Sequence, residues 1–285
     1  MSKLENFFGR PIGIFNWVFS NNSEECAKLA TQHGFSCLQW SFEHGSENIR
    51  ADAAQDAYRI FTEAGLKVVA LSGYQNLVAV DPIHKAKALN ILERYLEIAS
   101  FFPDSTGLAT ETGTKNPESQ WVGHPDNLKP EAWDEMIAQL QPLGEKAKAA
   151  GTKLLIEGYV ENIVRTADDI ERLKAEVDMD AFGFVMDPFN LILEEQVPTH
   201  TAETERVFTA MNGHVGIAHA KDLLYTDGVV ATPRSGTGMF DMQNYFKLLD
   251  EQLPGVPLIL EHLKAEEVGE TLDYLKQQYE LYKNS

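Results

Sequence analysis

Four side chains that could bind a metal ion lie at or near the ends of apolar runs in the second half of the chain. Each is separated from the next by about the length of one strand–helix unit. Because consecutive units of this kind bring the carboxyl ends of their strands to one mouth, the four side chains are expected to converge there. They are Glu157 after "KLLI", Asp187 after "FGFVM", His219 in "HVGIAHA" and Glu261 after "PLIL".

Three carboxylates and one imidazole in a partly dry pocket would repel one another and raise the carboxylate pKa values. A divalent cation removes that cost. An O/O/O/N ligand set suits Mn²⁺, Mg²⁺ or Co²⁺, with Zn²⁺ as a further choice. Taken singly, each residue has a simpler structural role: an ion pair, a turn before a proline, a core histidine or a loop cap. Together on consecutive units they predict one divalent metal ion, with Mn²⁺ favoured.

The elements that must position these residues alternate between short apolar runs and longer amphipathic stretches. Eight such units in 285 residues predict a single (β/α)8 TIM barrel that spans residues 1–285. An open doubly wound sheet would favour a glycine-rich turn after the first strand, and "FNWVFSNNS" contains no glycine. The predicted strands are 11–15, 35–40, 66–71, 105–110, 153–157, 182–187, 214–220 and 257–261.

Helix signals separate these strands. Ser23 is the predicted cap of a helix that Gly34 closes, and Thr166 and Asp169 have the spacing of a capping box. Pro142 is expected to kink or split the helix predicted over 130–151. The irregular stretch 111–129 is predicted to be a loop over one mouth of the barrel.

The composition restricts the partners and the compartment. There are 24 Lys and Arg against 43 Asp and Glu, a formal charge of −19, which opposes nucleic-acid binding. No apolar run approaches the about 20 residues that span a bilayer, and the N-terminus does not resemble a signal peptide. Cys26 and Cys37 lack a metal or redox spacing. We therefore expect a cytoplasmic protein without a membrane or nucleic-acid partner, whose acidity serves solubility.

Over residues 150–265, the motifs "LLIEG", "VMDPFN", "HAKD" and "LILEH" resemble those of the xylose isomerase-like TIM barrels in order and spacing. That superfamily includes sugar-phosphate isomerases and epimerases, ketose 3-epimerases, inosose dehydratases and endonuclease IV. "SGTGMFD" at 235–241 resembles the segment that leads into the seventh helix of these barrels. The resemblance implies a metal on Glu157, Asp187, His219 and Glu261. It also implies that Glu157 and Glu261 form the acid–base pair.

Asn190 departs from the pattern of the superfamily. It stands where many ketose 3-epimerases and endonuclease IV have a histidine. This difference argues against a three-metal nuclease and against a standard ketose 3-epimerase. An asparagine can hydrogen-bond a substrate hydroxyl as donor and as acceptor, or it can satisfy loop backbone.

Further substrate contacts are predicted with a structural alternative for each. Glu111 could meet a sugar hydroxyl or solvent, and Lys221 could contact substrate or form an ion pair. Arg234 in "PRSGTG" is the candidate phosphate ligand, although one arginine alone favours a non-phosphorylated or acidic sugar derivative. His262 is predicted to point away from the site. Aromatic side chains at or beyond strand ends could stack on a sugar or pack in the core or in a lid: Trp17, Trp40, Tyr74 and Trp121.

These features predict a metal-dependent isomerase or epimerase that acts on a small ketose, sugar phosphate or polyol derivative through an enediolate. A lyase on the same site, dehydrating an inosose or decarboxylating an oxo-sugar acid, begins with the same step and is the alternative. An endonuclease IV-like hydrolase and a sugar binder without catalysis are less favoured. The amphipathic helices leave outer faces on which a homo-oligomer could form.

Overall fold

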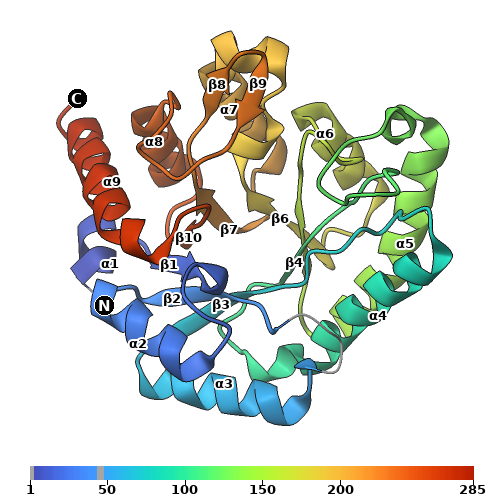
Figure 1. Ribbon diagram of the computed structural model, residues 1–285, viewed down its shortest axis with the longest axis horizontal. Coiled ribbons are helices and arrows are strands. Elements are labelled where there is room, and N and C mark those ends of the chain that lie inside the picture. The colour runs from blue at the N-terminus through green and yellow to red at the C-terminus, as the bar shows by residue number, and fades with distance from the viewer. Residues whose placement is uncertain (1–2, 44–47) are drawn as a thin grey trace.

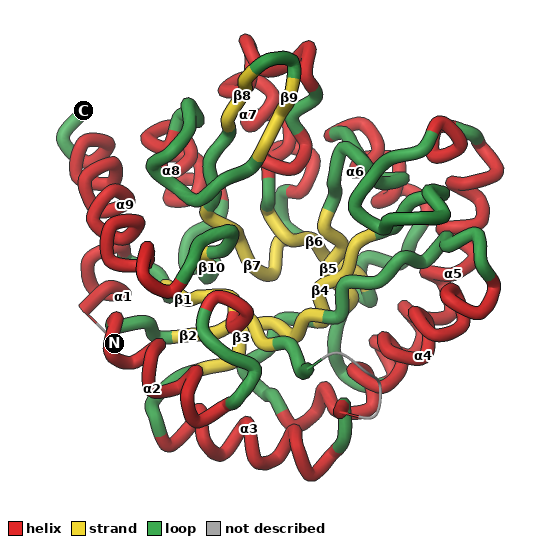
Figure 2. The backbone as a smooth tube through the Cα atoms, in the orientation of Figure 1, coloured by secondary structure: helices red, strands yellow, loops and turns green. Residues whose placement is uncertain are grey.

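The computed structural model describes residues 3–43 and 48–285 (Figure 1). A closed barrel of parallel strands forms its centre, with the strand order β1-β10-β7-β6-β5-β4-β3-β2 (Figure 2). This confirms the predicted (β/α)8 barrel. Every predicted apolar run overlaps one barrel strand. These strands are β1 (Ile12–Phe15), β2 (Cys37–Trp40), β3 (Lys67–Ser72), β4 (Leu108–Glu111), β5 (Leu154–Glu157), β6 (Phe182–Met186), β7 (Val215–Ala220) and β10 (Leu258–Leu260).

Helices surround the barrel and cover its apolar outer face (Figures 1 and 2). They are α1 (Lys3–Phe8), α2 (Ser23–His33), α3 (Ala51–Glu63), α4 (Pro82–Ile98), α5 (Pro130–Ala149), α6 (Ala167–Glu176), α7 (His200–Met211), α8 (Met242–Gln252) and α9 (Val268–Lys283). An antiparallel hairpin of β8 (Leu224–Thr226) and β9 (Val229–Ala231) follows β7. Within the described residues, no helix has both the length and the apolar character needed to cross a bilayer.

The predicted helix ends are mostly correct. Thr166 caps α6 and accepts a hydrogen bond from the Asp169 backbone, and Gly34 ends α2 in the left-handed conformation. The cap of α2, however, is Asn22, whose side chain accepts a hydrogen bond from the first turn, and Ser23 is already helical. Asparagine and serine are similarly good caps, so composition alone does not distinguish the two neighbouring positions.

Of the two predicted effects of Pro142, a kink or a split of the helix, the split does not occur. Helix α5 runs without interruption from Pro130 to Ala149. Proline removes one backbone hydrogen bond from a helix interior, and tertiary packing must offset that loss. The buried face of α5, which includes Trp133, Met136 and Leu140, provides such packing.

Side chains fill the interior of the barrel and so confine the polar site to one mouth. Leu155 of β5 belongs to this interior cluster and pairs in register with Gly183 of β6. A Cβ atom added at Gly183 or Gly216 would come within 3.0 or 2.7 Å, respectively, of a Leu155 methyl carbon. These two glycines therefore leave the space that Leu155 occupies, and the barrel is packed rather than open.

Candidate metal centre and substrate cavity

The four predicted metal ligands meet at the carboxyl-terminal mouth of the barrel. Glu157 is the last residue of β5, Asp187 directly follows β6, His219 lies in β7 and Glu261 directly follows β10. All four are buried, and one potential ligand atom from each lies within 4.8 Å of those of the others. The strand ends thus place one polar side chain each around a common point.

The charges of this cluster fit a divalent cation. The ammonium of Lys221, which is 1% exposed, lies 2.6 Å from both Asp187 Oδ2 and Glu261 Oε1. This ammonium and a protonated His219 together balance two of the three carboxylate charges. A divalent ion, the ammonium and a neutral imidazole would balance all three. Since an unbalanced buried charge is costly, the donor set fits Mn²⁺, Mg²⁺, Co²⁺ or Zn²⁺.

A chain of hydrogen bonds orients the histidine. His219 Nε2 lies 2.8 Å from Gln39 Oε1 and donates to it, because an amide oxygen only accepts. Gln39 Nε2 donates to Tyr74 Oη at 3.0 Å, and Tyr74 donates to Glu157 Oε2 at 2.5 Å. Nδ1 of the imidazole therefore faces the cluster, 3.0 Å from Asp187 Oδ2. In the neutral form this nitrogen carries the lone pair that a metal needs.

The glutamates of the cluster have pKa values that are shifted in opposite directions. Burial opposes the ionisation of Glu261, but the charges of His219 and Lys221 outweigh burial and hold its pKa well below the ordinary value. For Glu157, burial is the dominant influence and raises the pKa above the ordinary value. Burial also opposes charging of His219, yet the carboxylates of Glu261 and Glu157 keep its pKa well above the usual range. Two carboxyl groups shifted apart in this way suit an acid–base pair.

Asn190 contacts the cluster directly rather than only its own loop. Its Nδ2 donates to Glu157 Oε1 at 2.7 Å and to Asp187 Oδ2 at 3.2 Å. Its Oδ1 accepts from Lys221 Nζ at 3.1 Å. The amide therefore ties two candidate ligands to the buried ammonium and uses both its donor and its acceptor to do so.

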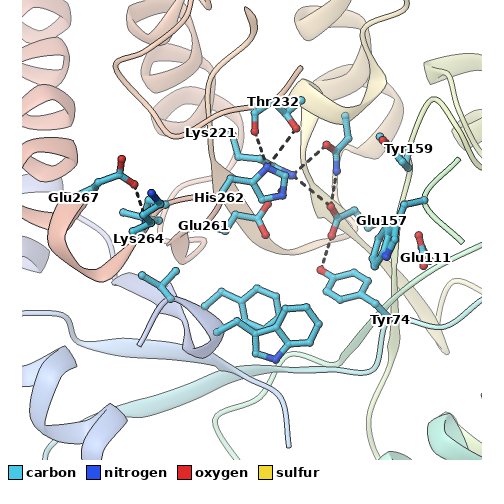
Figure 3. A pocket seen from close by; sticks show the side chains of 16 residues that line it. Tyr74, Glu111, Glu157, Tyr159, Lys221, Thr232, Glu261, His262, Lys264 and Glu267 are labelled. Carbon is cyan, nitrogen blue, oxygen red and sulfur yellow. Dashed lines mark hydrogen bonds and ion pairs between the residues drawn. The ribbon is translucent and has the colours of Figure 1, made fainter. Parts of the chain in front are cut away.

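A cavity of about 660 Å³ lies over the cluster. Figure 3 shows Glu157 and Glu261 among the side chains around it. Glu111 also lines this cavity, beside Glu157 on the neighbouring strand. Its side chain is buried, and Oε1 has no hydrogen-bond partner among the residues that the structure describes. Burial, followed by the charge of Glu157, raises the pKa of Glu111 well above its usual range.

The remaining predicted contacts are divided between the cavity and its surroundings. Trp17 lines the cavity and is 46% exposed. Arg234 instead forms ion pairs with Glu267 at 3.4 Å and Glu270 at 3.0 Å. These carboxylates neutralise the guanidinium, so the geometry offers no support for a phosphate site on Arg234.

The prediction that His262 points away from the site is wrong. His262 lines the cavity (Figure 3), and its φ is 57°. Side chains alternate between two faces only within a strand, and β10 ends at Leu260. The left-handed backbone turns the imidazole inward, where Nδ1 lies 2.5 Å from the carbonyl oxygen of Thr232.

The segment 235–241 has a structural function that explains its glycines. The buried carboxylate of Asp222 accepts hydrogen bonds from the backbone of Gly236, Thr237 and Phe240. A Cβ atom at Gly238 would approach the Leu223 carbonyl oxygen to 2.2 Å. The glycines thus let this loop fold around Asp222 before α8 begins.

Sequence reasoning did not single out Gln39, although it lies in the network around His219. It is fully buried in β2 among apolar neighbours. A polar amide inside such a strand must find a partner, and that is the signal that could have identified it. Tyr74, named only as an aromatic residue at a strand end, proves to be the hydrogen-bond donor to Glu157.

Comparison with known proteins agrees with this geometry. The family model for the xylose isomerase-like TIM barrel matches residues 27–278, whereas no curated protein sequence matches significantly. A D-tagatose 3-epimerase-like protein has a similar structure, with 14% identity, coverage of 96% of this chain and 98% of that one, and a TM-score of 0.75. The probable 3-DHS dehydratase AsbF from Bacillus anthracis shares 14% identity over 93% of this chain and 97% of its own, with a TM-score of 0.71.

A xylose isomerase-like TIM barrel protein from Mycobacterium smegmatis, solved in complex with magnesium, shares 19% identity. The alignment covers 95% of this chain and 98% of that one, with a TM-score of 0.70. Identities this low establish a common fold alone, but the family model extends over most of the sequence. The chain therefore belongs to the family of xylose isomerase-like TIM barrels.

Proposed function

We propose that this protein is a divalent-metal-dependent isomerase or epimerase of a small oxo sugar or polyol derivative. The observation that carries the proposal is geometric: Glu157, Asp187, His219 and Glu261 converge within 4.8 Å of one another, and Glu157 and Glu261 line the cavity above them. The similarity to a D-tagatose 3-epimerase-like protein supports this reaction class.

The residues that would hold the metal are Glu157, Asp187, His219 and Glu261, and Mn²⁺ is the ion we favour. When bound by these residues, a divalent ion would supply Lewis-acid chemistry: it would acidify a C–H bond next to a substrate carbonyl and stabilise negative charge on oxygen. The imidazole of His219 must be neutral for this role. Gln39 keeps the proton on Nε2 and so leaves Nδ1 for the ion.

The protein's own groups move the proton. Glu261, paired with the Lys221 ammonium at 2.6 Å and therefore ionised, accepts the proton from carbon. Glu157, whose pKa is raised, delivers a proton to the opposite face of the same carbon or to its neighbour. Tyr74 and Asn190 bind the two oxygens of Glu157 and fix its orientation. Exchange with solvent then restores both glutamates.

The charge of the cavity supports an uncharged sugar. In the described part of the chain, four glutamates line it, against two lysines, Lys221 and Lys264. Arg234, the candidate phosphate ligand, is paired with Glu267 and Glu270, so its guanidinium is not available to a phosphate. We propose that Glu111 hydrogen-bonds a sugar hydroxyl, with Lys221 beside the substrate oxygens and Trp17 against the C–H surface of the sugar.

A lyase on the same site is the second candidate, and Glu111 is the observation that favours it. A buried carboxyl group with a raised pKa and an unpartnered oxygen is suited to protonate a departing hydroxide. The similarity to the probable dehydratase AsbF supports the same alternative.

The test is a proton-exchange screen. Protein loaded with Mn²⁺ is freed of excess metal and incubated in D₂O with free ketoses, ketose phosphates, inososes and sugar acids, and mass spectrometry follows each compound. We expect one uncharged oxo sugar to gain one deuterium without another change. Loss of water or carbon dioxide would move the assignment to a lyase. No change in any compound would refute the proposal.

A further inference from the structure

A second cavity of about 930 Å³ adjoins the one over the metal centre. Both cavities are lined by Trp17, Tyr74 and Trp121. Trp17 follows β1, and Trp121 belongs to the loop between β4 and α5. The two indoles are 46% and 48% exposed. A ligand that extends past these aromatic side chains would therefore occupy both cavities.

The lining of the second cavity suits an uncharged, hydroxylated ligand. Of the residues that the structure describes, three acidic side chains line it, against one lysine, Lys87. A phosphate or carboxylate group would meet net repulsion there. Gln75 and Gln120 contribute amide groups, which hydrogen-bond hydroxyls both as donors and as acceptors. The indoles at the boundary offer apolar surface to the C–H faces of a sugar ring.

The sizes of the two cavities indicate a ligand longer than one ring. The first cavity alone falls within the range of about 300–1,000 Å³ that encloses drug-sized ligands. A single small sugar bound at the metal centre would leave the second cavity empty. We infer that the second cavity binds another uncharged sugar ring, joined by a glycosidic bond to the oxo sugar at the metal centre. This inference rests on the proposed function for the first ring.

The test compares one-ring and two-ring sugars by isothermal titration calorimetry on the Mn²⁺-loaded protein. The matched pairs are D-fructose with isomaltulose, and methyl 3-oxo-α-D-glucopyranoside with 3-oxo-sucrose. We expect at least one two-ring sugar to bind about ten-fold more tightly than its one-ring partner, because stacking and burial each add favourable free energy.

The substitution His84→Trp fills the second cavity without touching the first. His84 is exposed on α4 and lines the second cavity. We expect this variant to lose the ten-fold preference and to bind the one-ring sugar unchanged. Lys87→Trp repeats the test should the first variant fold poorly. Asn90→Trp, at an exposed position on the same helix, is the control that keeps the preference.

Two results would overturn the inference. One is equal binding within both pairs, and the other is a His84→Trp variant that binds one-ring and two-ring sugars as the wild type does. Deuterium exchange distinguishes this failure from failure of the proposed function. Deuterium exchange without a preference for two-ring sugars would refute the second subsite and keep the proposed function. A preference for two-ring sugars without exchange would keep the second subsite and refute the proposed function.

Discussion

Removal of the ammonium of Lys221 tests the charge balance of the metal centre. Lys221 Nζ lies 2.6 Å from Asp187 Oδ2 and from Glu261 Oε1, and the side chain is buried. In the metal-free Lys221→Met protein, His219 would be left as the cation beside three carboxylates. Removing one partner of a buried ion pair costs about 3–5 kcal/mol. A chain of this length loses about 2 °C in Tm per kcal/mol, so we expect a decrease of about 6–10 °C.

Added Mn²⁺ should reverse most of this loss, because the ion places two positive charges among the same oxygens. Ligand binding stabilises the folded state according to its occupancy, so the rise in Tm on addition of Mn²⁺ should be larger in the variant than in the wild type. The assay is differential scanning calorimetry in EDTA and in Mn²⁺.

Lys85→Met is the matched control. Lys85 Nζ lies 2.7 Å from Glu135, and both side chains are more than a quarter exposed. An ion pair of this kind contributes about 0–1 kcal/mol, so Tm should change by about 2 °C at most, with an unchanged response to Mn²⁺. The reasoning is refuted if the metal-free Lys221→Met variant has the same Tm as the metal-free wild type, or if Mn²⁺ raises the Tm of the variant and of the wild type equally.

Four further predictions follow from the same geometry. Glu157→Gln and Glu261→Gln should each reduce deuterium exchange at least about 100-fold, whereas the exposed Glu270→Gln keeps it; near-native exchange in either variant would remove the acid–base pair. Gln39→Leu should weaken Mn²⁺ binding about 10–100-fold in calorimetric titrations, because it frees the imidazole to rotate, and an unchanged Kd would contradict that. Since the pKa of His219 is raised, metal must displace its proton. Apparent affinity for Mn²⁺ should therefore rise with pH, by up to about ten-fold per pH unit while His219 is protonated, with about one proton released per ion; binding without proton release would exclude this. Glu111→Gln keeps a hydrogen-bond donor but no acidic proton, so it should retain epimerisation and lose any dehydration, and loss of both activities would assign Glu111 another role.

The barrel and the convergence of the four cluster residues were readable from the sequence because parallel barrel strands are buried on both faces. Such strands appear as short apolar runs, and a polar residue at the end of a run stands out. Glu157 and Asp187 are examples, each placed where an apolar run stops. Local helix signals were less exact, as the shift from Ser23 to Asn22 shows, because neighbouring residues with equal capping ability compete.

Residues that act through distant partners were not readable. Gln39 lies inside an apolar run, and its partner His219 is 180 residues away in the chain. His262 was assigned to the wrong side because strand alternation was extended two residues beyond the end of β10, to a position where the backbone is left-handed. The amide of Gln39 interrupts an apolar run and so indicates that a partner exists, but the identity of that partner and the backbone angle of His262 depend on how the barrel closes.

By itself, the sequence determined the barrel, the polar residues at the carboxyl ends of its strands and the chemical nature of the candidate metal ligands. These properties depend on apolar periodicity and residue type, which are local. Only the tertiary structure decided that Lys221 lies among the carboxylates, that Arg234 is neutralised by α9 and the turn before it, and that two cavities share Trp17 and Trp121. Each of these depends on distances between elements far apart in the chain, which closure of the barrel sets and local composition does not encode.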